Sequence, residues 1–409
     1  MSFPRPIVFL NNKLITCDTI VPLIWEIMIR RPGGRAVFVV MERRTYEAVN
    51  ANIVLRDAIR EMGTLIYLGR PRPGAVAGLL HRFAVIPRLA YWLMLAWLGQ
   101  TTFLHFKALN QWPLKILGLL APSRTIFAEG SPFGESELEL KFAKIIGPRN
   151  RDLPKVVGQT LIRFRDDWPS YADPRNAKRT HFKLDLPFAG RQWLDYLDKV
   201  ADRYLATAFT EAGIATGTEI VACPIGSIAE SEVFRGERTL WRLLEEIIEI
   251  VGETLPDLPL IIKPHPASIE QGLEVEALLA SHPKVKGFVS HLHPMVLATR
   301  ARCAISFAYT TSFAAMKSVG TPTIEYTDYT DNVLKLTNNG SFRPDMVDHF
   351  INHDPAVLRR TLRSLRPCPN GIQPTKISAA LPDEVVDLLG GGLAGAHGRR
   401  YYGSYETGA

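Results

Sequence analysis

Short apolar runs alternate with longer amphipathic segments through the first third of the chain. The apolar runs have the length of buried strands and cover residues 7–10, 36–41, 64–68, 102–105 and 125–128. Between them, residues 20–29 and 45–62 repeat apolar side chains at helical spacing. This alternation is typical of a parallel sheet covered by helices. We therefore predict that residues 1–150 form an N-terminal α/β domain.

A second series of the same kind begins near residue 216. It contains strand-like runs that start at Glu219, Leu260, Gly287, Cys303 and Thr323, with a helical segment over 239–251. Residues 216–365 are accordingly predicted to form a second α/β domain. Residues 151–215 mix prolines, charged stretches and an amphipathic segment, which indicates a helical interdomain connection. Residues 366–409 form a C-terminal segment with a flexible, glycine-rich tail. The predicted fold class is α/β, with two Rossmann-like, doubly wound domains facing a cleft.

Composition agrees with two folded domains. A length of 409 residues exceeds what one hydrophobic core usually supports, and the chain is 46% hydrophobic and 22% charged, as expected of a globular protein. The four cysteines lie far apart without a CxxC pair, which argues against a zinc site and a disulfide framework. The first residues lack the pattern of an export signal. We therefore expect the protein to be cytoplasmic.

The net charge of +7 favours an anionic partner. Modules for nucleic-acid binding are missing, so we predict no nucleic acid among its partners. Residues 79–120 crowd apolar side chains, including Trp92 and Trp97, between basic residues. The apolar run within this stretch, from Phe83 to Leu98, is too short for a membrane span, and Pro87 interrupts it. It fits a helix lying on an anionic membrane surface, which would place the protein at the inner face of the cell membrane, and it fits a core helix equally well.

The segment from Leu260 to Pro266 carries the first candidate site. Its apolar run ends at Lys263, and His265 then stands between Pro264 and Pro266. Because proline fixes φ and keeps the preceding residue extended, His265 is expected on a stiff loop at the carboxyl end of a strand. Open α/β sheets bind ligands at that edge.

Hydroxyl-bearing residues follow a later strand, at Thr310, Thr311 and Ser312. They fall where a helix begins, so hydroxyls and free backbone N–H groups could hold a phosphate there. The loop with Gly226 and Ser227 would allow close backbone approach to the same ligand.

Three further residues are candidates to contact the same ligand. Glu325 is expected to end a strand, where it could accept hydrogen bonds from a ribose or remain a surface charge or helix cap. His291 and His293 are either neighbours of the base or phosphate or plain loop residues.

Several enzyme classes are excluded by missing motifs. Neither a G-x-G-x-x-G nor a G-x-x-x-x-G-K-[ST] pattern follows a predicted strand, which argues against dehydrogenases and P-loop enzymes. No convincing DxD pair occurs, and no third ligand accompanies His291 and His293. We therefore predict neither a metal nor another cofactor.

These residues together resemble bacterial glycosyltransferases of the GT-B architecture that build surface polysaccharides, especially the sialyltransferase, polysialyltransferase and capsule Kdo-transferase groups. Lys263-Pro264-His265-Pro266 resembles their HP motif, which implies that His265 contacts the phosphate of a cytidylate donor. Thr311-Ser312 resembles their hydroxyl pair. Phe127-Ala128-Glu129-Gly130-Ser131 resembles their acidic motif in part, because Ala128 stands where several of these families have the catalytic base. Glu129 or Glu135 would have to replace it.

The resemblance implies a metal-independent, inverting glycosyltransferase that moves a CMP-activated acidic sugar to a surface glycan or glycolipid acceptor. Three alternatives stay open. A CDP-polyol phosphotransferase and a UDP-sugar enzyme such as a 2-epimerase share the predicted fold. A non-catalytic protein that binds a nucleotide or a partner enzyme would explain Ala128.

Overall fold

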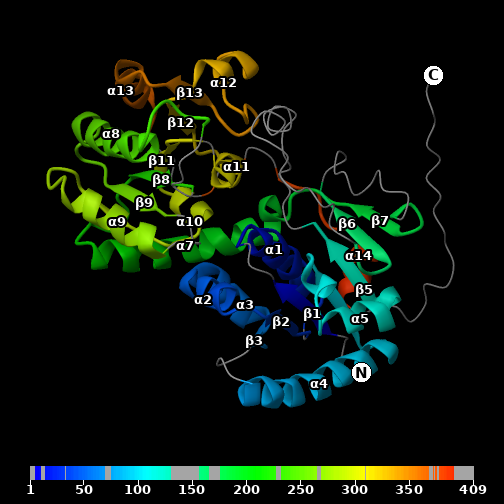
Figure 1. Cartoon of the computed structure of the whole chain (residues 1–409). Helices are drawn as coiled ribbons and strands as arrows, with labels where there is room; N and C mark the ends of the chain where they lie inside the picture. Colours follow the sequence, from blue (N-terminus) through cyan, green and yellow to red (C-terminus); the bar gives the residue numbers. More distant parts are fainter. Residues whose placement is uncertain are drawn as a thin grey trace, which may run out of the picture.

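Two parallel sheets, formed one after the other along the chain, organise the molecule (Figure 1). The structure is a computed structural model, and it describes residues 5–10, 14–32, 34–69, 75–129, 156–164, 176–226, 232–264, 269–308, 310–367, 372, 374 and 377–390. Both sheets carry helices on their faces, so the predicted α/β fold class with two doubly wound domains is confirmed.

The first sheet has the strand order β3-β2-β1-β4-β5-β6-β7. Its strands are β1 (Arg5–Leu10), β2 (Ala36–Val40), β3 (Gly63–Tyr67), β4 (Thr101–His105), β5 (Thr125–Ala128), β6 (Thr160–Arg163) and β7 (Thr180–Lys183). The central strands consist of apolar residues because helices cover both faces of a parallel sheet. These helices are α1 (Leu14–Arg30), α2 (Arg43–Ala51), α3 (Ile53–Met62), α4 (Ala75–Trp97) and α5 (Lys115–Leu120).

The second sheet has the order β10-β9-β8-β11-β12-β13. Its strands are β8 (Ile220–Pro224), β9 (Leu260–Lys263), β10 (Gly287–Val289), β11 (Ala301–Ser306), β12 (Thr323–Thr327) and β13 (His349–Asn352). The helices are α8 (Thr239–Thr254), α9 (Ile269–Ala280), α10 (Pro294–Ala298), α11 (Thr311–Ser318), α12 (Asp331–Leu336) and α13 (Pro355–Ser364). In both sheets the order of strands reverses beside the first strand of the domain, between β1 and β4 and between β8 and β11.

The first sheet extends further along the chain than the sequence indicated. Residues 151–215 were expected to be a helical connection, but β6 and β7 lie in this range and pair with β5 and with each other. Each is four residues long and lies among prolines and charges, so neither shows a clear apolar run. The helical part is α7 (Arg191–Glu211), which links the two domains.

The chain returns to the first domain at its described C-terminal end. Helix α14 (Asp383–Gly390) packs against α1 and β1, and its residues Val385 and Leu389 are fully buried. Just before this helix, the Leu381 N–H donates to Glu26 Oε1 at 3.0 Å. Residues 377–390 therefore complete the core of the first domain.

An aromatic cluster joins the two domains through α7. Trp193 is 1% exposed, and its ring lies 6.1 Å from that of Trp25 on α1 and 5.2 Å from that of Tyr196 on its own helix. Its third neighbour is His293 of the second domain, with ring centroids 6.2 Å apart. One side chain thus contacts both halves of the molecule.

Residues 79–120 fit both a core helix and a surface helix because α4 has two apolar faces, one buried and one exposed. Trp92 is buried, with its ring 6.0 Å from that of Phe9 on β1. Trp92 therefore belongs to the core of the first domain, whereas Trp97 is 64% exposed. In the described part of the chain, no helix is long and apolar enough to cross a membrane.

We expect Trp193→Ala to lower the free energy of unfolding by about 3 to 5 kcal/mol, because it leaves a cavity where three elements meet. Trp97→Ala, at an exposed indole, should cost less than about 1 kcal/mol. Denaturant unfolding followed by circular dichroism measures both. Equal midpoints for the two variants would show that the cluster does not stabilise the fold.

Candidate functional site

The carboxyl edge of the second sheet collects most of the residues selected from the sequence. Strands β9, β8 and β11 are neighbours, and Pro224 pairs with Lys263 at their carboxyl ends. Gly226, Lys263 and Thr310 therefore come to one edge, beside the reversal of strand order where ligands bind in such sheets. His265, Pro266 and Ser227, which follow Pro264 and Gly226 in the sequence, lie outside the described residues.

Lys263 brings a buried positive charge to this edge. Its carbonyl accepts a hydrogen bond from the Ile225 N–H at 3.0 Å, so the loop that carries Gly226 runs directly beside it. Among the described residues, no atom lies within 4 Å of a Cβ added at Gly226. Within that part of the chain, the backbone at Gly226 is therefore accessible beside a cation, an arrangement that admits an anionic ligand.

His291 follows the neighbouring strand β10 and is close enough to Lys263 to respond to its charge. Burial and the Lys263 ammonium group hold the pKa of His291 below its usual range, and Glu276 partly opposes them. This shift favours the neutral imidazole, which can act there as a hydrogen-bonding group.

His293 has a structural role in the described geometry. Its side chain is buried, and its Nδ1 accepts a hydrogen bond from the Met295 N–H at 3.2 Å, which caps α10. Of the two histidines, His291 is thus the one placed beside Lys263.

Helix α11 begins where the hydroxyl-rich segment predicted it. Thr310 is its N-cap, and the Thr310 hydroxyl accepts a hydrogen bond from the Ser312 N–H at 3.4 Å. Thr311 and Ser312 form the first turn. The helix-capping hydroxyl is therefore that of Thr310, and the side chains of Thr311 and Ser312 do not cap this helix.

Glu325 lies in the interior of the second domain. It was expected to end a strand, but β12 continues to Thr327, because the residues that follow Glu325 extend the pairing with β13. The Glu325 carboxylate is fully buried and accepts a hydrogen bond from the Tyr329 hydroxyl at 2.5 Å. The ribose contact stays a prediction for a carboxylate that already has an internal partner.

Glu129 occupies the carboxyl edge of the first sheet, directly after β5. Its side chain is fully buried, and Oε2 accepts a hydrogen bond from the Phe164 N–H at 2.8 Å. Its own N–H donates to Ile162 O at 3.0 Å. Glu129 therefore ties the end of β5 to the end of β6. The role of catalytic base stays a prediction, and Glu135 lies outside the described residues.

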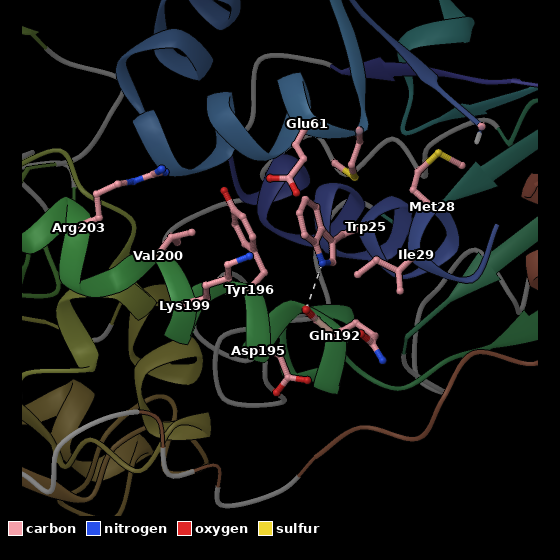
Figure 2. A pocket seen from close by; sticks show the side chains of 12 residues that line it. Trp25, Met28, Ile29, Glu61, Gln192, Asp195, Tyr196, Lys199, Val200 and Arg203 are labelled. Carbon is pink, nitrogen blue, oxygen red and sulfur yellow. Dashed lines mark hydrogen bonds between the residues drawn. The ribbon is translucent and has the colours of Figure 1, made fainter. Parts of the chain in front are cut away.

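A cavity that the sequence did not indicate lies between α1, α3 and α7, with a volume of about 580 Å³ (Figure 2). Indole, phenol and thioether side chains line it together with charged groups, and the Trp25 Nε1–H donates to Gln192 O at 3.1 Å across one side. Its lining residues Gly34 and Met62 lie just before β2 and β3, so it is at the amino edge of the first sheet. Residues selected from the sequence are absent from its lining.

One group of side chains in the described residues has the geometry of metal ligands. Glu245 and Glu249 on α8 face His282, with His282 Nε2 4.0 and 3.6 Å from their carboxylate oxygens. His282 Nδ1 lies 2.9 Å from Leu278 O. His282 precedes β10, at the edge of the sheet opposite Lys263, and both carboxylates are exposed. This group is therefore separate from the candidate site.

Comparison with known proteins establishes the fold. No family model matches the chain, and no curated protein matches it in sequence. Among solved structures, a UDP-N-acetylglucosamine 2-epimerase superposes with a TM-score of 0.53 at 11% identity, covering 95% of this chain and 91% of that one. An S. aureus MnaA structure with UDP gives a TM-score of 0.49 at 10% identity, covering 95% and 90%. The UDP-GlcNAc 2-epimerase of Neisseria meningitidis gives 0.48 at 12%, covering 87% and 90%.

The chain has the GT-B fold. The described residues form two parallel sheets with helix α7 between them, and α14 returns to the first domain. Because the identity is only 11%, the similarity to the epimerase supports a conclusion about the fold alone.

The division of roles around α11 can be tested by stability. We expect Thr310→Ala to lower the free energy of unfolding by about 1 kcal/mol, because the Ser312 N–H loses its acceptor. The double variant Thr311→Ala/Ser312→Ala should change it by less than about 0.5 kcal/mol. Urea titration of the parent and the two variants measures the difference. A larger loss of unfolding free energy in the double variant would show that Thr311 and Ser312 cap the helix instead.

Proposed function

We propose that this chain is a glycosyltransferase that binds a nucleotide sugar at the carboxyl edge of the second sheet and transfers the sugar to a glycan or glycolipid acceptor. The observation that carries the proposal is the meeting of Lys263, Gly226 and the first turn of α11 at the reversal of strand order. A buried cation, open backbone and a helix N-terminus form one anion-binding surface there.

The phosphate of the donor would lie against this surface. The Lys263 ammonium group and the backbone N–H groups of α11 favour negative charge, and the hydroxyls of Thr311 and Ser312 can donate hydrogen bonds to phosphate oxygens. His265, two residues after β9 in the sequence, would add a further group. These groups would stabilise the departing phosphate without a metal ion or a further cofactor.

The transfer itself requires a base on the side of the first domain. In an inverting step, the acceptor hydroxyl oxygen bonds to the anomeric carbon while the bond from that carbon to the phosphate oxygen breaks. The phosphate leaves with the electron pair, and the hydroxyl proton passes to a carboxylate. We assign this carboxylate to Glu129, with Glu135 as the second choice. The hydrogen bond from the Phe164 N–H to Oε2 fixes the orientation of this carboxylate.

Two donor classes follow from two different observations. The motif around His265 resembles that of enzymes using CMP-activated acidic sugars, which is our first choice. The fold likeness to a UDP-N-acetylglucosamine 2-epimerase supports the second candidate, an enzyme acting on a UDP sugar.

A thermal-shift panel of CMP, CDP, UDP and GDP distinguishes these donors. A nucleotide that binds the folded protein at about 100 times its Kd adds about 2.7 kcal/mol to the stability, so its melting temperature rises. We expect CMP to give the largest shift, and a dominant shift with UDP would select the second candidate. His265→Ala and Lys263→Met should reduce the shift, whereas Lys286→Met, at the opposite edge of the same sheet, should retain it. No shift with any nucleotide would contradict the proposed site.

The base assignment predicts that Glu129→Gln lowers turnover by at least about a hundredfold, because an amide cannot accept the proton. Its amide oxygen can still accept the Phe164 N–H, so melting temperature and nucleotide affinity should stay near those of the parent. Transfer assays and calorimetric titration measure the two effects. If Glu129→Gln and Glu135→Gln both turn over at the parental rate, the base is another residue. Nucleotide binding by the parent without transfer to any acceptor would indicate a binding protein.

A further inference from the structure

The outer face of α4 is apolar although it is exposed. Its buried face packs Val85, Leu89, Trp92, Leu93 and Ala96 against the first sheet. The opposite face presents large apolar side chains at Ile86, Tyr91, Met94, Trp97 and Leu98. A helix at the surface of a soluble domain normally turns polar residues outward, so this face lacks the composition that water favours.

The same surface continues onto α5 and the loop before it. Leu119 and Leu120 at the end of α5 are exposed, and so is Trp112. The Trp97 Nε1–H donates to Leu120 O at 3.0 Å, which fixes the ends of the two helices to each other. In Figure 1, α4 lies at the lower rim of the molecule with α5 beside it, away from the second sheet. The exposed apolar residues of α4, α5 and Trp112 are called the α4 surface below.

The stretch of sequence that contains this surface has charges of one sign. From residue 62 to residue 128 the sequence contains no Asp or Glu, and it contains seven basic residues: Arg70, Arg72, Arg82, Arg88, Lys107, Lys115 and Arg124. The whole chain has 48 basic and 41 acidic residues, a difference of +7. This stretch alone therefore supplies a charge equal to that of the entire chain. A partner of the α4 surface must be apolar in its interior and anionic at its boundary.

We propose that the α4 surface docks onto an anionic lipid bilayer, with α4 lying in the plane of the interface. Tryptophan and tyrosine are suited to the boundary between headgroups and acyl chains, and the flanking cations attract anionic headgroups. A protein partner would need an acidic rim around an apolar patch, whereas an anionic membrane offers both properties at every point of its surface. The docking is independent of the chemistry proposed for the second sheet.

Flotation with vesicles of phosphatidylcholine containing about one third phosphatidylglycerol tests this directly. The full chain should bind these vesicles at low salt and be released at about 1 M salt, where charges are screened. Pure phosphatidylcholine should bind at least about tenfold less. Tryptophan fluorescence should shift to shorter wavelength on binding, as Trp97 and Trp112 leave water.

The matched variants are Met94→Gln/Leu98→Gln on the α4 surface and Leu273→Gln on α9 of the second domain. Leu98 and Leu273 are both 62% exposed, so Leu273→Gln matches the Leu98→Gln change within the double variant, and Met94 is a further exposed apolar residue at 45%. We expect the double variant to lose at least about tenfold in vesicle affinity with an unchanged melting temperature, and Leu273→Gln to bind like the parent. Arg88→Glu should weaken binding to the anionic vesicles.

Three results would overturn the proposal. The first is absence of binding by the parent at low salt. The second is equal loss of binding in Leu273→Gln. The third is a dimer in analytical ultracentrifugation that Met94→Gln/Leu98→Gln dissociates while vesicles leave the parent unbound, because the surface would then be covered by a second copy of the chain.

Discussion

The position of one sheet relative to the other depends on the packing of Trp193. Its ring contacts Trp25 of the first domain and His293 of the second, and His293 in turn caps α10. The same hydrophobic cluster contains Val8 of the first sheet and Ala222 of the second. Each domain therefore lacks a fully separate core. The carboxyl edge of the second sheet, with the candidate phosphate site, is held at a fixed place by side chains that also belong to the interior of the first.

Much of the fold could be predicted because buried parallel strands leave strong apolar runs. Residues 125–128 and 287–289 form the strands predicted for them. Local chemistry and pairing with distant segments account for the elements that the sequence did not predict. Residues 45–62 have continuous helical spacing, yet two helices meet at Asn52, whose side chain accepts the Leu55 N–H and starts α3. The four-residue strands β6 and β7 are stabilised by pairing with neighbours, which a short window of sequence does not contain.

The candidate site shows the same division between local and distant causes. The meeting of Lys263, Gly226 and Thr310 could be predicted, because the carboxyl ends of adjacent parallel strands share an edge. The burial of Glu129 could not, since its partner Phe164 is 35 residues away. The cavity beside α7 was also missed, because the charged residues on that helix fit an ordinary solvent-facing stripe.

The return of α14 to the first domain has a consequence for the order of folding. The Leu381 N–H bonds to Glu26 across 355 residues of chain, and the buried side chains of Val385 and Leu389 pack there as well. During synthesis, the first domain emerges from the ribosome long before these residues exist. Until then, part of its apolar surface stays exposed to solvent and to chaperones. Native packing of the first domain must therefore wait until the second domain has been translated.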